Sequence, residues 1–490
     1  MNLLTICSEF IYDHYGIIIA LLSFSLSLVA SIHALMNKND VSSAVGWVVF
    51  ILFSPLLGAI IYFIFGINRI RRKNIKQLRI RMKQETTKQE NDRICNFIKE
   101  QKNNSLISLN KLGDSVSRFS MTYGNEIELL VSGDLTYRVM LEYIEKAEKS
   151  IILESYIFDR TGIGKTFVET LKRAVDRGVE VRVLIDAVGA RYSFPSVYRS
   201  LVNNNIPVAT FNGNLIAGLR LPYANLRTHR KILIIDGEVA FTGGMNISNN
   251  YFTEYKKEGC FQDVHFKVKG PAVRDLFKLA LEDWYFTTKE NLNTERWSIK
   301  KADNLSSENS LVRVVASGPD DDFSTNLKII IGALSVAQKY IYISTPYFLP
   351  DNCFIVSLLT AARRGVMIDI VVPYNNNVKL IFKAMFAQFN QLLTQNCRIW
   401  LSQGQFDHSK LFTMDGVWSY VGSSNLDPRS FRLNFEVDME IVDKSIANKI
   451  EKIINNRKQH AIRVTNKMLR NQPFYRRLIN KVIWLGSAYL

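Results

Sequence analysis

The sequence predicts an α/β fold of two homologous lobes related by a pseudo-twofold, each a mixed sheet flanked by helices. A two-helix transmembrane hairpin is expected to precede the two lobes. Three observations lead to this prediction. One motif occurs twice about 180 positions apart, strands and helices alternate within each half, and two long apolar runs lie near the N-terminus.

The two apolar runs cover residues 17–36 and 45–67, and each reaches the roughly 20 residues needed to cross a bilayer. A cleaved signal peptide is the alternative interpretation of the first run. Against it, no basic segment precedes residue 17 and the second run follows directly. Residues 1–68 are therefore predicted to form the transmembrane hairpin.

A cluster of basic side chains follows the second run, whereas the loop between the runs carries one Lys and one Asp. The positive-inside bias places this cluster, and all that follows it, in the cytoplasm. The same side chains suit anionic headgroups. Residues 69–124 are predicted to be a basic juxtamembrane helix and a linker. The basic cluster comprises Arg69, Arg71, Arg72, Lys73, Lys76, Arg79, Arg81 and Lys83.

Strand and helix alternate in the first lobe, residues 125–305. The expected strands are 126–132, 150–158, 180–186, 232–235 and 264–268, and the expected helices are 137–149, 165–177 and 272–284. The second lobe, residues 306–490, repeats this plan, since residues 147–153 resemble 337–343 and residues 177–184 resemble 364–371. Its basic end, residues 457–490, is either an amphipathic helix on the bilayer or a helix packed on the lobe.

The repeated motif is His-x-Lys-x4-Asp, and in both copies Gly and Asn follow the Asp at matching offsets. Two matches that share these trailing positions exceed what chance would give. Apolar residues between Lys and Asp predict a buried strand, with His and Lys on one face. The first copy contains His229, Lys231, Asp236 and Asn246, and the second contains His408, Lys410, Asp415 and Asn425.

These residue types suit chemistry at a phosphodiester. A neutral imidazole can attack phosphorus, and a charged imidazole can protonate the departing oxygen. Lys and Asn offer charge and an amide donor to the non-bridging oxygens. Such an exchange needs no metal and no cofactor. Asp236 and Asp415 either contribute to the site or bond backbone at the far end of the buried strand.

The motifs and the residues around them resemble the phospholipase D superfamily, and in particular the membrane-bound bacterial cardiolipin synthases. The resemblance rests on the segments 345–348, 407–410 and 429–436, and it covers almost the whole chain. It implies that His229 is the nucleophile and His408 the general acid and base.

Each imidazole also needs an acceptor that fixes its other nitrogen. The candidates are Glu436, which follows Asn425 at the interval typical of the family, and Asp263, which follows Asn246 at a longer interval.

The formal charge of +17 and a pI near 9.5 favour an anionic partner, either nucleic acid or an acidic lipid surface. Two membrane spans favour lipid and argue against nucleic acid. The resemblance implies that the substrate is phosphatidylglycerol, two molecules of which give cardiolipin and glycerol at a bacterial plasma membrane. A phospholipase D-type hydrolase, a nuclease of the superfamily and a non-enzymatic membrane scaffold remain as alternatives.

Overall fold

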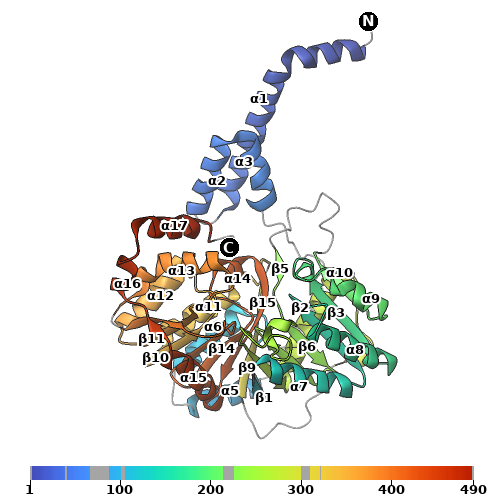
Figure 1. Cartoon of the computed structure of the whole chain (residues 1–490), viewed down its shortest axis with the longest axis vertical. Coiled ribbons are helices and arrows are strands. Elements are labelled where there is room, and N and C mark those ends of the chain that lie inside the picture. The colour runs from blue at the N-terminus through green and yellow to red at the C-terminus, as the bar shows by residue number, and fades with distance from the viewer. Residues whose placement is uncertain are drawn as a thin grey trace. The chain divides into compact units, whose positions relative to one another are not determined.

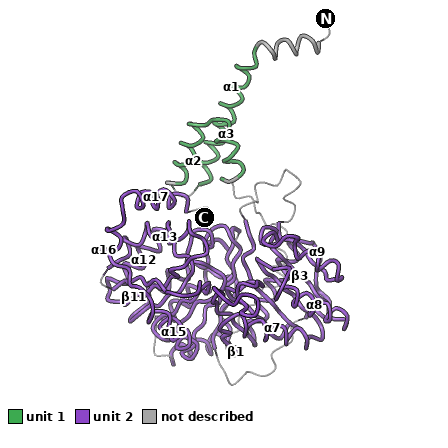
Figure 2. The backbone as a smooth tube through the Cα atoms, in the orientation of Figure 1, with its two compact units in different colours: residues 1–71, 214–225 green, residues 72–213, 226–490 purple. Residues whose placement is uncertain are grey.

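The computed structural model describes residues 3–38, 41–66, 88–100, 105–212, 226–298, 310–320, 322–394 and 396–487. The chain divides into two compact units, one of residues 1–71 and 214–225 and the other of residues 72–213 and 226–490 (Figure 2). The smaller unit holds the N-terminal helices, and the larger unit, called the main body below, holds both lobes. The basic cluster predicted next to the membrane lies outside the described residues.

Among its described residues, the N-terminal unit contains one helix that is long and apolar enough to cross a membrane, His14–Asn37 within α1 (Leu3–Asn37). This helix coincides with the first predicted span. The second predicted span is interrupted at Pro55, because proline has no N–H to donate and its ring disfavours a continuous helix. It forms three pieces, which are α2 (Val41–Phe53), α3 (Pro55–Ile61) and the π-helical turn η1 (Tyr62–Gly66).

The main body is built on a single mixed sheet whose strand order reads the same outward from its centre (Figure 1). The central strands pair antiparallel. The order is β1-β8-β7-β6-β2-β3-β4 on one side and β9-β15-β14-β13-β10-β11-β12 on the other, where the short strand β16 adds an edge beyond β12. The same neighbours are parallel or antiparallel in both halves, for example the parallel pairs β2–β3 and β10–β11. The duplicated sequence therefore forms two copies of one topology joined at the centre of the sheet.

The first lobe carries the following strands: β1 (Thr122–Val131), β2 (Ser150–Ser155), β3 (Glu180–Asp186), β4 (Val208–Phe211), β5 (Arg227–Thr228), β6 (Ile232–Ile235), β7 (Val239–Gly243) and β8 (Val264–Lys269). Its main helices are α7 (Gly133–Lys146), α8 (Ile163–Asp176), α9 (Val197–Asn203) and α10 (Pro271–Thr288). Each predicted element is present, with small shifts at the ends. Apolar side chains of the strands and of α7 and α8 form its core.

The second lobe carries these strands: β9 (Ser310–Ser317), β10 (Tyr340–Ser344), β11 (Met367–Pro373), β12 (Cys397–Ser402), β13 (Leu411–Met414), β14 (Trp418–Gly422), β15 (Asn434–Val442) and β16 (Ile462–Arg463). Its helices are α11 (Thr325–Val336), α12 (Asn352–Arg363), α13 (Lys379–Leu392), α14 (Pro428–Arg432), α15 (Lys444–Gln459), α16 (Asn466–Arg470) and α17 (Phe474–Leu485). The hydrophobic core of this lobe is separate from that of the first.

The segment expected to be a linker differs from the prediction. It contains helices α5 (Lys88–Glu100) and α6 (Ser105–Val116), whose apolar side chains join the core of the second lobe. The fully buried Arg313 of β9 ties α6 to the sheet, since its guanidinium donates to Asp114 and to Glu440. The polar residues that separate the apolar ones concealed this role.

Candidate active site

Each motif histidine lies three residues before its buried strand, β6 or β13, and is bonded to the backbone of the other lobe. The short strand β5 pairs in parallel with the start of β15, and the His229 N–H donates to the carbonyl of Phe435 at 2.8 Å. In the second lobe, the His408 N–H donates to the carbonyl of Gln262 at 2.8 Å. The backbone of each lobe therefore fixes the histidine of the other.

The residue that follows each of those carbonyls is a carboxylate, and it contacts the imidazole. His229 Nδ1 lies 2.9 Å from Glu436 Oε2, and His408 Nδ1 lies 3.0 Å from Asp263 Oδ2. Both candidate acceptors thus lie beside imidazoles, and each belongs to the opposite lobe. With Nδ1–H donated to a carboxylate, Nε2 keeps its lone pair and is available as a nucleophile or base.

The two lysines lie next to the histidines of their own motifs. Lys231 Nζ donates to the carbonyl of His229 at 2.6 Å. Lys410 Nζ lies 3.0 and 3.1 Å from the two ring nitrogens of His408. Lys410 Nζ also donates to the carbonyl of His408 at 2.5 Å, so both ammoniums bind the backbone of their histidine, and the second additionally contacts the imidazole.

Burial and positive charge keep both imidazoles neutral. Burial, followed by the charges of Lys231 and Lys410, holds the pKa of His229 well below its usual value. Burial and Lys410 lower the pKa of His408 to about 3, although Asp263 opposes the shift. Since each lysine acts on the histidine of the other lobe as well, the two half-sites form one electrostatic centre.

The pKa values of the two lysines lie close to neutral pH. Burial lowers the pKa of Lys231 to about 7 and that of Lys410 to about 8, with Glu436 and Asp263 opposing the shifts. Removal of an ammonium from water lowers both values, and the charge of Lys410 lowers that of Lys231 further. An anionic phosphodiester between the two lysines would stabilise both ammoniums, so the site favours an anion.

Two further contacts were not predicted from the sequence. Ser423 donates its hydroxyl to Glu436 Oε2 at 2.6 Å, and Tyr251 lies with its hydroxyl 3.1 Å from His408 Nδ1. Ser423 occupies the motif position that differs from Gly244, and this difference was the available signal. Nothing in the sequence singles out Tyr251, a first-lobe residue that meets the histidine of the second lobe.

The two asparagines occupy equivalent positions but differ in their bonds. Asn246 Oδ1 accepts the N–H of Ile157 at 3.1 Å. Asn425 Oδ1 is buried, and among the described residues it has no hydrogen-bond partner. Both side chains are nearly inaccessible, like those of the motif histidines and lysines.

Asp236 and Asp415 are not brought to the histidines. Each follows the last residue of a four-residue buried strand, which places it about 13 Å from the start of that strand. Both adopt φ 55°. Asp236 accepts the N–H groups of residues 148, 149 and 150, and Asp415 those of 338, 339 and 340. The geometry corresponds to the second of the two roles considered for them, which is backbone bonding.

Comparisons with known proteins identify the family to which the chain is similar. The family described as "Cardiolipin synthase, PLD-like domain" matches residues 140–267 and 330–458, and that described as "Phospholipase D-nuclease N-terminal" matches residues 25–66. A cardiolipin synthase of Oceanobacillus iheyensis is 30% identical over 459 residues, which cover 91% of this chain and 94% of that protein. One from Alkalihalophilus pseudofirmus is 29% identical over 474 residues, covering 95% and 93%.

A solved structure shows the same fold. The phosphatidylserine synthase of Haemophilus influenzae superposes with a TM-score of 0.58 at 16% identity, over 78% of this chain and 100% of that one. At this identity the likeness concerns the fold alone.

Proposed function

The chain belongs to the cardiolipin synthase family with paired phospholipase D-like domains, and on that premise we propose that its site transfers a phosphatidyl group between two phosphatidylglycerol molecules. The products are cardiolipin and glycerol. The observation that carries this proposal is the pair of imidazole–carboxylate contacts that cross between the lobes, with two buried lysines beside them.

In the first step, Nε2 of His229 attacks phosphorus and the bond from phosphorus to the glycerol oxygen breaks. His408 delivers a proton to that oxygen, and a phosphatidyl-histidine remains. In the second step, His408 removes a proton from the terminal hydroxyl of a second phosphatidylglycerol. The resulting oxygen bonds to phosphorus, the nitrogen–phosphorus bond breaks, and His229 is regenerated.

The proton for the first step is held jointly by Lys410 and His408. The ammonium lies 3.1 Å from His408 Nε2, and the two groups titrate as a pair. When the substrate phosphate arrives, its negative charge offsets the lysines and raises the pKa of the imidazole, which can then carry the proton. The phosphoryl oxygens are bound by Lys231, Lys410, Asn246 and Asn425. Asp236 and Asp415 hold the far ends of the buried strands through backbone hydrogen bonds.

The setting proposed for this chemistry is the cytoplasmic face of a bacterial plasma membrane. Residues 1–68 would span the bilayer twice, with the interrupted segment 41–66 as the second span, and residues 69–124 would lead to lobes at 125–305 and 306–490. Anionic phospholipid, and no nucleic acid, is the proposed partner. The apolar α1 and the net charge of +17 support this arrangement.

A lipid-product assay on the purified full-length protein tests the proposal. Phosphatidylglycerol in detergent should give cardiolipin and glycerol in equal amounts, and His229→Ala should abolish both with the protein level unchanged. Phosphatidic acid as the main product would instead identify a hydrolase. Intact-mass measurement after rapid quenching should reveal a phosphatidyl adduct in the unmodified enzyme and none in His229→Ala; an adduct that persists in His229→Ala would exchange the two roles.

A further inference from the structure

Helix α17 lies on the main body with its apolar side outward. Its buried Asn480 faces the second lobe, and Ile483 and Trp484 pack against the core of that lobe. A helix on a water-soluble surface normally has the opposite orientation. The outward side chains are between 45% and 76% exposed, and they are Phe474, Tyr475, Leu478, Ile479, Val482 and Leu485.

These residues form one continuous stripe. At 100° per residue, Phe474, Leu478, Val482 and Leu485 fall within a quarter-turn of one another, and Tyr475 and Ile479 extend the same side. Basic side chains flank the stripe on both edges, with Arg477 and Lys481 on one and Arg476 on the other. This is the pattern of a helix that lies in the interface of a membrane.

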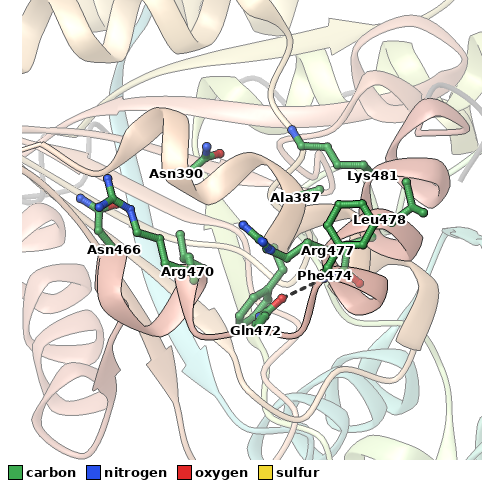
Figure 3. A pocket seen from close by; sticks show the side chains of 12 residues that line it. Ala387, Asn390, Asn466, Arg470, Gln472, Phe474, Arg477, Leu478 and Lys481 are labelled. Atoms are coloured by element: carbon green, nitrogen blue, oxygen red, sulfur yellow. Dashed lines mark hydrogen bonds between the residues drawn. The ribbon is translucent and has the colours of Figure 1, made fainter.

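A pocket of about 540 Å³ opens beside the Arg477 edge of the stripe, between α13, α16 and α17 (Figure 3). Its lining includes three cations, Arg470, Arg477 and Lys481, and no carboxylate. Four side-chain amides and the rings of Phe386 and Phe474 complete the wall. Within the described part of the chain none of the three cations is paired with an acid.

Charge and shape together specify the occupant. Three unpaired cations with amide donors suit a phosphodiester anion, and the stripe continues from the pocket along an exposed apolar surface. A free phosphate or a soluble phosphorylated metabolite would use the cations and leave the stripe uncovered. A diacyl lipid with an anionic headgroup would use both.

We propose that the pocket between α13, α16 and α17 binds the headgroup of an anionic phospholipid whose acyl chains run along the outward stripe of α17. This site is separate from the histidine centre. It anchors the second lobe to an anionic bilayer, and it does not depend on the proposed catalytic function.

Photo-crosslinking tests the proposal. The full-length protein, carrying His229→Ala and His408→Ala so that the probe is not consumed, is placed in phosphatidylcholine nanodiscs. These contain 5% phosphatidylglycerol with a diazirine in one acyl chain. We expect labelling of residues 466–487 at least fivefold above that obtained with a phosphatidylcholine probe. Charge reversal by Arg470→Glu, Arg477→Glu and Lys481→Glu should reduce it to the phosphatidylcholine level.

The matched control reverses three exposed lysines of α15, namely Lys444, Lys449 and Lys452. In Figure 1, helix α15 lies at the lower edge of the main body and α17 at its upper edge. This control should retain full labelling. The milder pair Arg477→Gln and Lys481→Gln, both at exposed side chains, should lose about threefold and serves if the triple variant does not fold.

Three results would overturn the proposal: equal labelling by the two probes, unchanged labelling after charge reversal, or displacement by 10 mM glycerol 1-phosphate, which would identify a site for soluble phosphates. Cardiolipin formation by protein with intact histidines is measured separately. Activity without selective labelling refutes the lipid site alone, and labelling without activity refutes the catalytic proposal alone.

Discussion

Glu436, which contacts His229, accepts hydrogen bonds from Ser423 at 2.6 Å and from Asn434 at 3.1 Å. Asp263 has a different setting. Its partner His408 also contacts Tyr251, and Gly244 lies next to the Asp263 carboxylate. The first imidazole is therefore fixed by a carboxylate with further side-chain partners. The second lies among several groups that exchange protons. This difference matches a nucleophile that must keep its orientation and an acid–base group that must change its charge.

The buried ion pair behind each motif differs in a similar way. In the first lobe Arg230, within the motif, pairs with Asp283 of the following helix α10. In the second lobe the polarity is inverted, since Asp407 beside the motif pairs with Arg457 of α15 at 2.7 Å. The two pairs use different motif positions, since Ser409 corresponds to Arg230 and Thr228 corresponds to Asp407. Duplication has thus kept the backbone, while these buried side chains diverged.

Among substitutions that compare the two half-sites, removal of either lysine should lower the reaction rate most. Lys231→Met and Lys410→Met should each lower kcat by about 10²- to 10³-fold, equivalent to about 3–4 kcal/mol, because a buried cation at the phosphoryl oxygens is lost. Initial rates of cardiolipin formation at saturating phosphatidylglycerol measure this. If the lysines were merely structural, kcat would stay within threefold and thermal stability would change instead.

The crossed carboxylates should separate the two chemical steps. Glu436→Gln should slow mainly formation of the phosphatidyl-histidine, by about 10²-fold, because an amide does not select the required tautomer of the nucleophile. Asp263→Asn should slow both formation and transfer by a similar factor, because His408 donates a proton in the first step and removes one in the second. Rapid-quench measurement of adduct and product resolves the steps. Equal slowing of both steps by both variants would show that the half-sites are not specialised.

The pH profile should report the lowered pKa values. Both histidines stay neutral well below pH 6.5. A plot of kcat/KM against pH should therefore show no fall as the pH is lowered through 6.5. The value of kcat/KM should fall as the pH rises through about 7 to 8, where Lys231 and Lys410 lose their protons. The bound phosphate raises these pKa values, so the fall in kcat should lie at higher pH. An acid limb centred on 6.5 would contradict the assignment.

Making the half-sites alike should have the smallest effect. Ser423→Gly removes one hydrogen bond to Glu436 and should cost about 1 kcal/mol, a five- to tenfold loss of kcat. Gly244→Ser is not its mirror image, since a Cβ there would lie 2.8 Å from both carboxylate oxygens of Asp263. It should impair the His408 step more than Ser423→Gly impairs the His229 step. Similar losses of kcat in both variants would show that the two half-sites do not differ in function.

The sequence reveals the repeat and the buried strands, because a two-residue spacing and an apolar run report directly on local backbone. It also identifies Glu436 and Asp263, but spacing along the chain cannot say that each serves the opposite lobe. The longer interval before Asp263 accommodates Tyr251 and the segment that reaches Asp407. Pro55 was visible in the second apolar run, yet composition alone does not show where a helix is interrupted.

The backbone bond from His229 to Phe435 has a consequence for biosynthesis. The imidazole and the carboxylate that orients it are 207 positions apart, so a ribosome that has completed only the first lobe has produced a histidine without its acceptor. Nascent chains are consequently inert toward the lipids around them. Chemical competence is acquired in one event, when the late strand β15 docks beside β5 and both halves of the centre are assembled together.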